Sequence, residues 1–199
     1  MRRKRVGFVS VLIFIIFAVP VYAAAPLAVV ENNVNKVLDV LRDPRLKAPA
    51  AKEEKAQRLR VIYNGMFNEV EFSRRTLGRN WNQFTPAQRT EFIELFKQVL
   101  EKAYLDKILS YTNEKIEYSR EIIHSDRLAE VQTKIVTASQ EIPIFYRLVF
   151  ADGNWKVYDV VVENVSLVQN YRTQFNDILA KNNPEHLLEI LRKRVKEQQ

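Results

Sequence analysis

The stretch WKVYDVVVENVSLVQNYRTQF, residues 155–175, decides the fold, because its hydrophobic period changes within it from two residues to nearly four. The first part alternates as a β-strand does, and we expect a strand over residues 155–163. Alternation predicts two faces, with Tyr158, Val160 and Val162 on one and Trp155, Val157 and Val161 on the other.

The second part of the stretch predicts an amphipathic helix that starts directly after the strand. Ser166 and Gln169 have the spacing of a capping box, which satisfies backbone N–H groups at a helix start. The apolar residues that follow fall on one side of this helix, namely Leu167, Val168, Tyr171, Phe175, Ile178 and Leu179.

Further strands precede this stretch. The tripeptide Asp152-Gly153-Asn154 is typical of a hairpin turn, and it joins the strand after it to a strand expected over residues 143–151. Apolar residues alternate with polar ones from Ile116 to Ile122 and again from Ala129 to Ile135. We therefore expect an antiparallel, curved sheet of about four strands.

Helices are expected on both sides of the sheet in the sequence. Valines and leucines at helical spacing predict a helix over residues 27–42, which Asp43-Pro44 ends. A long helix is expected to start at Thr85-Pro86 and to run to about Ser110. A last helix follows Asn183-Pro184, and the whole order indicates an α+β domain with helices covering one face of the sheet.

The first residues have the pattern of a secretory leader. A basic segment, Arg2 to Arg5, precedes an apolar run that is short for a membrane span, and Val21-Tyr22-Ala23 is a cleavable small-residue pattern. We expect a cleaved signal peptide over 1–23, with cleavage after Ala25 as the second choice, and a single domain over 24–199. An uncleaved N-terminal anchor is the alternative.

Composition excludes several classes of function. Removing the four basic residues of the leader lowers the formal charge from +7 to +3, so a nucleic-acid role loses its main support. The chain has no cysteine and only two histidines, His124 and His186, without metal-ligand spacing. We expect no metal, no catalytic residue and no cofactor.

Residues 155–175 resemble the most characteristic stretch of the MlaC family of periplasmic toluene-tolerance proteins. The segments Leu77-Gly78-Arg79-Asn80-Trp81 and Gln88 to Phe96 are also similar to that family. Asn164 stands where the family usually has glycine, and asparagine tolerates a left-handed backbone better than most residues.

The resemblance implies a periplasmic phospholipid-binding shuttle that helps to maintain the lipid asymmetry of the outer membrane, not an enzyme. The implied fold is a cone of the cystatin-like or nuclear-transport-factor-like (NTF2-like) type that encloses an apolar cavity. The implied partners are phospholipid as cargo, an outer-membrane lipoprotein–porin complex, and an inner-membrane ABC transporter with an MCE-type periplasmic domain. A monomer suits a shuttle best.

Smooth apolar walls suit flexible acyl chains, whereas catalysis needs convergent polar groups. Each wall residue is also compatible with an ordinary filled core, because hydrophobic periodicity does not distinguish a filled interior from a hollow one. The residues expected to line a lipid cavity are Phe96, Val99, Leu100, Tyr104, Tyr146, Leu148, Tyr158, Val160, Val162, Val168, Tyr171 and Phe175.

Two other classes of function stay open at this point. A periplasmic adaptor or chaperone needs the same fold with a filled core and no lipid. A small NTF2-like enzyme with Asp159 as general base is the less favoured alternative. Arg172 could contact a phosphate headgroup, although a structural ion pair is the more common role for such a residue.

Overall fold

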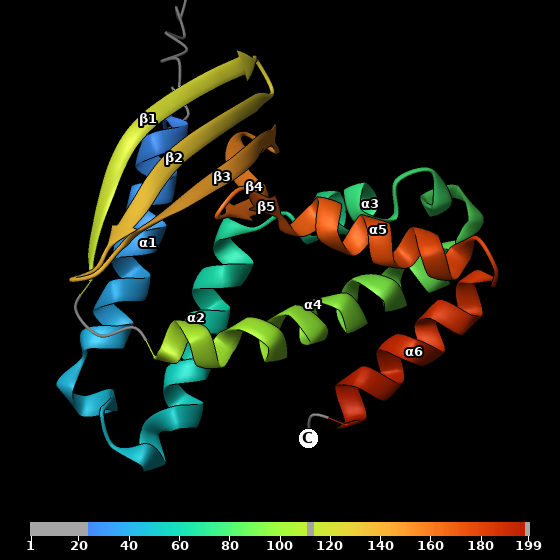
Figure 1. Ribbon diagram of the computed structural model, residues 1–199, viewed down its shortest axis with the longest axis horizontal. Helices are drawn as coiled ribbons and strands as arrows, with labels where there is room; N and C mark the ends of the chain where they lie inside the picture. The colour runs from blue at the N-terminus through green and yellow to red at the C-terminus, as the bar shows by residue number, and fades with distance from the viewer. Residues whose placement is uncertain (1–23, 111–113, 198–199) are drawn as a thin grey trace, which may run out of the picture.

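A computed structural model describes residues 24–110 and 114–197 (Figure 1). The expected signal peptide, residues 1–23, lies outside these ranges. No helix within them is long and apolar enough to cross a membrane.

The N-terminal half of the chain is helical. Asp43 ends α1, because its side chain accepts a hydrogen bond from the Arg45 backbone N–H and starts a short 3-10 turn. The helices and 3-10 turns of this half are α1 (Pro26–Arg42), η1 (Pro44–Leu46), η2 (Pro49–Ala51), α2 (Lys52–Met66), α3 (Glu69–Leu77), η3 (Gly78–Gln83) and α4 (Pro86–Leu109).

The start of α4 confirms the capping box expected there. The Thr85 hydroxyl accepts a hydrogen bond from the Gln88 backbone N–H, and the Gln88 side chain accepts one from the Thr85 N–H. Pro86 occupies the first helical turn, where its missing N–H costs nothing. The helix begins and ends within a residue of its expected bounds.

Five strands form one antiparallel sheet in which each strand pairs with the next along the chain. The fold class is confirmed, and the sequence missed only the short fifth strand. The strands are β1 (Lys115–Ser125), β2 (Leu128–Val136), β3 (Glu141–Ala151), β4 (Asn154–Val162) and β5 (Val165–Ser166).

A register shift in β4 corrects the two faces expected for this strand. Val157 pairs with Leu148, but the next paired residue of β4 is Asp159, opposite Arg147, so Tyr158 is an extra residue in a bulge. The expected grouping of Tyr158 with Val160 is therefore wrong. The inner face of β4 instead carries Trp155 and Val157 before the bulge and Val160 and Val162 after it.

The chain leaves the sheet through a tight turn. Glu163 and Asn164 adopt positive φ values of 49° and 67°, so asparagine does take the left-handed conformation expected at position 164. The Ser166 hydroxyl then accepts a hydrogen bond from the Gln169 N–H and caps α5 (Leu167–Leu179). The chain ends with α6 (Pro184–Glu197).

Most of the buried apolar residues in the described part of the chain fall into two clusters that share no residue. Leu41, Leu46, Ala56 and Leu59 are buried outside both, within α1, η1 and α2. We call the first the helical cluster, because it belongs to α3, α4, α5, α6 and η3, which lie beside the sheet in Figure 1. We call the second the sheet cluster, because it joins the inner face of the sheet to α1 and to the end of α2. The two clusters adjoin where β4 and β5 lead into α5.

Candidate functional site

Seven of the twelve residues expected to line a cavity lie in or against the helical cluster. Six of these are buried, and Tyr104 is only partly buried. The seven are Phe96, Val99, Leu100 and Tyr104 on α4, and Val168, Tyr171 and Phe175 on α5.

The aromatic rings of this group contact one another. The ring centroids of Phe96 and Tyr171 lie 4.9 Å apart, and those of Phe96 and Phe175 lie 5.3 Å apart, both edge to face. Phe92, which was not among the twelve, lies 5.6 Å from Phe175 in the same way. The centre of the helical cluster is thus a filled core, and a lipid-facing role for its fully buried residues stays a prediction.

Four of the other five residues lie on the inner face of the sheet. Leu148 is fully buried in the sheet cluster, and Tyr146 and Val160 are partly buried against it. Val162 pairs with Ile144 in the adjacent strand and is half-buried. These four residues therefore share a face, as expected, but only Leu148 is covered completely.

Tyr158 is the residue that the bulge removes from this face. Its ring lies under the guanidinium group of Arg75 on α3, with the carbon of that group 3.9 Å from the ring centroid. A cation over an aromatic face is a favourable contact that fixes the position of both groups. Tyr158 thus has a structural partner outside the sheet cluster.

The two clusters differ in how well they are covered. The helical cluster has fifteen buried hydrophobic residues and five partly buried ones, whereas the sheet cluster has seven buried and eight partly buried. We call the boundary between them the seam. Each cluster has partly buried apolar residues packed against it, among them Tyr104 and Leu167 for the helical cluster and Tyr118, Tyr146 and Val160 for the sheet cluster.

Tyrosine side chains in both clusters sit in an environment that disfavours charge. Burial raises the pKa of Tyr171 to about 12, and Tyr104 beside it also opposes ionisation. Burial likewise raises the pKa of Tyr146 on the sheet side. Both hydroxyl groups therefore lie among apolar groups that disfavour a charged side chain.

Asp159, the general base of the enzyme alternative, uses both of its carboxylate oxygens in hydrogen bonds to neighbouring groups. One carboxylate oxygen accepts hydrogen bonds from Arg147 Nη1 at 3.1 Å and from the Ser166 hydroxyl at 2.6 Å. The other accepts one from the Val168 backbone N–H at 3.0 Å. The residue is only 1% exposed, so it holds the junction of β4 with α5 and is closed to a substrate.

Arg172 also has a structural partner. Its guanidinium group donates hydrogen bonds to the backbone carbonyl of Arg75 near the end of α3, one of them at 2.8 Å. The side chain passes close to Gly78, where an added Cβ would lie 3.5 Å from Arg172 Nε. Arg172 therefore ties α5 to α3.

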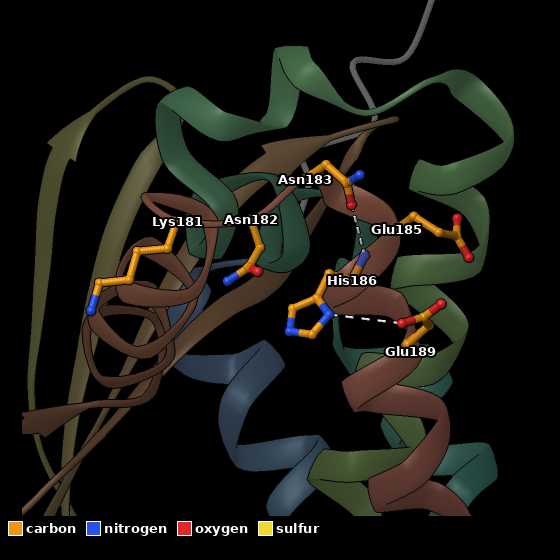
Figure 2. A pocket seen from close by; sticks show the side chains of 6 residues that line it. All are labelled: Lys181, Asn182, Asn183, Glu185, His186 and Glu189. Carbon is orange, nitrogen blue, oxygen red and sulfur yellow. Dashed lines mark hydrogen bonds and ion pairs between the residues drawn. The ribbon is translucent and has the colours of Figure 1, made fainter.

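A polar depression of about 460 Å³ lies at the turn between α5 and α6 (Figure 2). The His186 backbone N–H donates to the Asn183 side chain, and His186 Nδ1 lies 3.7 Å from a Glu189 oxygen. Lys181 points away from the histidine in Figure 2. The first contact caps the start of α6, and the second joins two residues one turn apart in that helix. Neither brings a nucleophile beside a base.

A second depression, of about 520 Å³, lies between the α2–α3 junction and the β3–β4 hairpin. Lys97, Asp152 and Lys156 are among the residues that line it. Neither depression includes any of the twelve expected residues. Residues 24–110 and 114–197 also contain no group of three or more His, Asp or Glu side chains that could hold a metal ion.

Comparison with known proteins decides the family. A profile described as MlaC protein matches residues 31–193, which is most of the chain. The chain belongs to the MlaC family. The resemblance carried by residues 155–175 and by the helical segments before them is thereby confirmed.

Two curated relatives have names that refer to phospholipid transport and to toluene tolerance. The intermembrane phospholipid transport system binding protein MlaC of Haemophilus influenzae is 26% identical over 119 residues, which cover 57% of this chain and 56% of that protein. The toluene tolerance protein ttg2D of Pseudomonas putida is 30% identical over 99 residues, 49% of this chain and 46% of that protein. The chain thus spans about half the length of the curated relatives it matches.

A solved structure shares the fold. The phospholipid-binding protein of Ralstonia solanacearum, determined in complex with a phospholipid, matches with a TM-score of 0.78 over 88% of this chain and 99% of its own. Its sequence identity is 22%, so the likeness shows the fold alone. An MlaC-type curved sheet with helices beside it is therefore established for this chain.

Sequence reasoning left two partly buried apolar residues out of the expected lining. Tyr118 lay on a predicted strand and Leu167 on a predicted helix, but neither was included in the expected lining. The alternation of Ile116 and Tyr118 did put an aromatic residue on the same face as Ile116, and both pack against the sheet cluster. The expected place of Ile122 on that face is wrong, because a register shift between Tyr118 and Arg120 makes Ile122 the partner of Glu130 on the other face. The position of Leu167, one residue after a capping serine, places it beside the sheet.

Proposed function

We propose that this MlaC-family protein binds one phospholipid with its acyl chains in the seam between the two clusters. The observation that carries the proposal is the incomplete cover of the sheet cluster, whose partly buried apolar residues outnumber its buried ones. A contiguous apolar surface that a folded domain leaves incompletely covered usually marks a binding site. The family and the names of the relatives supply the chemical class of the ligand.

The energetics of lipid transfer favour a carrier over an enzyme. Two acyl chains with about thirty methylenes cost roughly 25 kcal/mol to expose to water, so a carrier must cover them almost completely. Moving them from a bilayer into an apolar seam is nearly balanced by comparison. The protein then needs no energy source of its own, and its partners set the direction of transfer.

The cellular setting belongs to the same proposal. We infer export to the periplasm with removal of residues 1–23, and a single monomeric domain over 24–199 that works without a cofactor. It would pass phospholipid between an outer-membrane lipoprotein–porin complex and an inner-membrane ABC transporter with an MCE-type domain. Intact-mass measurement of the periplasmic protein tests the export step, with a chain that begins at Ala24 as the expected result.

Lipid extraction followed by mass spectrometry tests the central claim. Protein purified from the periplasm under detergent-free conditions should carry about one phospholipid per chain, because release into water is so costly. A folded chain that carries no phospholipid and takes none up from vesicles would contradict the proposal. That result would favour the adaptor or chaperone alternative.

A matched pair of variants locates the ligand. Val160→Arg places a charge on the sheet side of the seam, where desolvation of the charged group is costly, and should abolish copurification of lipid. Val165→Arg makes the same change at a residue that is 56% exposed and should leave lipid content unchanged. Circular dichroism must show both variants folded, and a folded Val160→Arg protein with normal lipid content would place the ligand elsewhere.

A further inference from the structure

Helices α4 and α6 lie side by side and run in the same general direction (Figure 1). Near their starts, the Gln88 side chain of α4 donates a hydrogen bond to the Glu185 carboxylate of α6. Toward their ends, the Lys102 side chain of α4 donates one to the Val195 carbonyl of α6. The C-terminal ends of both helices therefore point away from the turn between α5 and α6.

Basic side chains lie at these two C-terminal ends. Lys107 stands in the last turn of α4, and Arg194 and Lys196 stand in the last turn of α6. Lys107 and Lys196 are exposed, and Arg194 is half-buried. We call these three residues, together with Lys102, the basic end. Cations are favourable in this position, because the C-terminus of a helix carries a partial negative charge.

The basic end lacks the acidic partners that a neighbouring arginine of α6 has. The Arg192 guanidinium lies 2.7 Å from a Glu91 oxygen of α4 and 2.7 Å from a Glu185 oxygen. Within residues 24–110 and 114–197, none of the four residues of the basic end forms an ion pair. Their charges are thus not used to hold the fold together.

The acidic residues of the same helix ends are paired with other cations. Glu101 and Asp106 of α4 each lie within 3.1 Å of a basic side chain of α2. Glu197, near the end of α6, lies 3.5 Å from Lys193. These carboxylates do not neutralise the basic end, which keeps a surplus of positive charge.

An exposed aliphatic residue accompanies these cations. Ile108 directly follows Lys107 and is 43% exposed, which is unusual for a large apolar side chain. The Lys107 ammonium lies over the Tyr104 ring, with its nitrogen 5.4 Å from the ring centroid. Basic side chains beside an exposed aliphatic one are typical of protein surfaces that lie on anionic membranes.

A lipid surface fits the basic end better than an acidic protein does. Neither of the two depressions described above contains a residue of the basic end. A protein partner needs a closely packed contact of matching shape. A bilayer adapts to any arrangement of cations and accepts an aliphatic side chain between its headgroups, so charge and one apolar contact are enough.

We propose that the basic end docks on an anionic membrane surface, with Ile108 entering the headgroup layer. Lipid phosphates neutralise Lys107, Arg194 and Lys196, and the C-terminal ends of α4 and α6 face the bilayer. Such docking needs no cargo in the seam. It therefore goes beyond the proposed function, and either proposal can fail without the other.

Co-sedimentation with vesicles tests the docking. The purified protein is mixed with vesicles of phosphatidylcholine alone or of equimolar phosphatidylcholine and phosphatidylglycerol, and the fraction that sediments is measured. Binding to the anionic vesicles should be at least about tenfold stronger and should weaken with added salt, because salt screens charges at a surface. Equal binding to both vesicles, or no binding to either, would overturn the proposal.

A matched pair of double variants locates the surface. Lys107→Glu/Arg194→Glu should weaken binding to the anionic vesicles about twenty-fivefold, since each basic residue near such a surface contributes roughly fivefold. Lys36→Glu/Lys181→Glu changes the net charge equally at two exposed lysines, in α1 and in the turn before α6, and should weaken binding less than about twofold. Equal losses would mean that binding follows net charge, and would overturn the role of the basic end.

Two controls accompany these variants. Circular dichroism must show both proteins folded, and Lys107→Glu/Lys196→Glu, which changes exposed residues only, replaces the first pair if Arg194→Glu prevents folding. The phospholipid content of the same proteins is measured separately. A protein that carries phospholipid but binds no anionic vesicle would overturn the docking and leave the proposed function in place.

A fluorescent label shows which side meets the bilayer. The chain has no cysteine, so Ile108→Cys offers a single thiol for an environment-sensitive dye, and Lys181→Cys offers the matched control. Anionic vesicles should shift the emission of the dye at position 108 to shorter wavelength and leave it unchanged at position 181. Equal shifts, or none at 108, would overturn this orientation.

A soluble polyanion tests the other kind of partner. Polyglutamate carries negative charge without a bilayer, so it should bind the protein much more weakly than the anionic vesicles do. Polyglutamate that binds as tightly as the vesicles, with the same loss in Lys107→Glu/Arg194→Glu, would overturn the membrane proposal in favour of an acidic polypeptide.

Discussion

The helical cluster and the sheet cluster are built from similar residues but are covered to different extents. The helical cluster surrounds interlocked rings such as Phe96 and Phe175, both buried almost completely. The sheet cluster leaves Tyr146, Trp155 and Val160 only partly covered by α1. The difference suggests a division of labour, in which one cluster provides stability and the other provides a surface for a ligand.

The largest expected effect is on the helical cluster. Phe175→Ala should lower the free energy of unfolding by about 3–5 kcal/mol, because it removes a fully buried ring and leaves a cavity. Urea denaturation of delipidated protein measures the loss. A cost below about 1 kcal/mol would show that this cluster is not the packed core of the molecule.

The junction between the clusters should be the next most sensitive point. Asp159→Ala removes the acceptor for Arg147, Ser166 and the Val168 N–H, and should cost about 2–4 kcal/mol. Asp159→Asn keeps the shape of the side chain and should cost less. The same urea titration compares the two, and equal losses would mean that the charge on Asp159 contributes nothing.

A glycine at the edge of the helical cluster should show a smaller effect. Gly78 has a φ of 55° and a ψ of −128°, a conformation essentially restricted to glycine, and Gly78→Ala should cost about 1–2 kcal/mol. Gly153→Ala at the β3–β4 hairpin is the matched control, since its φ is 77° but no atom lies within 4 Å of an added Cβ. An added Cβ at Gly78 would lie at an ordinary van der Waals distance from Arg172, so the expected loss comes from backbone strain, and thermal unfolding of both variants should show Gly153→Ala as the milder change.

The smallest expected effect is a dependence on alkaline pH. Burial raises the pKa of Tyr171 from 10.0 to about 12, so folding favours the neutral phenol. The contribution of this residue is complete below pH 10 and is lost as the pH rises toward 12, because the unfolded chain releases the proton first. Tyr171→Phe should therefore lose less stability than the unmodified protein between pH 10 and 12, as urea midpoints at each pH would show. An equal loss in both proteins would mean that Tyr171 is accessible to solvent.

Most of the fold could be predicted from local patterns. The capping box at Thr85 and the left-handed turn at Asn164 each have a local physical cause that the sequence displays. The helix bounds followed from the spacing of apolar residues and from Asp43 and Pro44. The fifth strand is two residues long, which is too short for a pattern to be visible.

The site was less accessible to the same reasoning. Periodicity placed Phe96 and Val160 in one cavity wall, yet they belong to different clusters. Whether two apolar faces meet depends on the arrangement of helices that are far apart in the sequence. The periodicity of one helix or strand identifies its apolar face but not the element that this face contacts.

The extra residue in β4 changes which positions of this strand should be sensitive in a systematic substitution scan. In a regular strand, sensitivity to polar replacement alternates with strict parity from one end to the other. Before Tyr158 the sensitive inner positions are Trp155 and Val157, and after it they are Val160 and Val162. The sensitive positions are therefore odd-numbered before the bulge and even-numbered after it. Alignments of β4 with relatives that lack the insertion would need a one-residue gap at Tyr158 to match equivalent side chains.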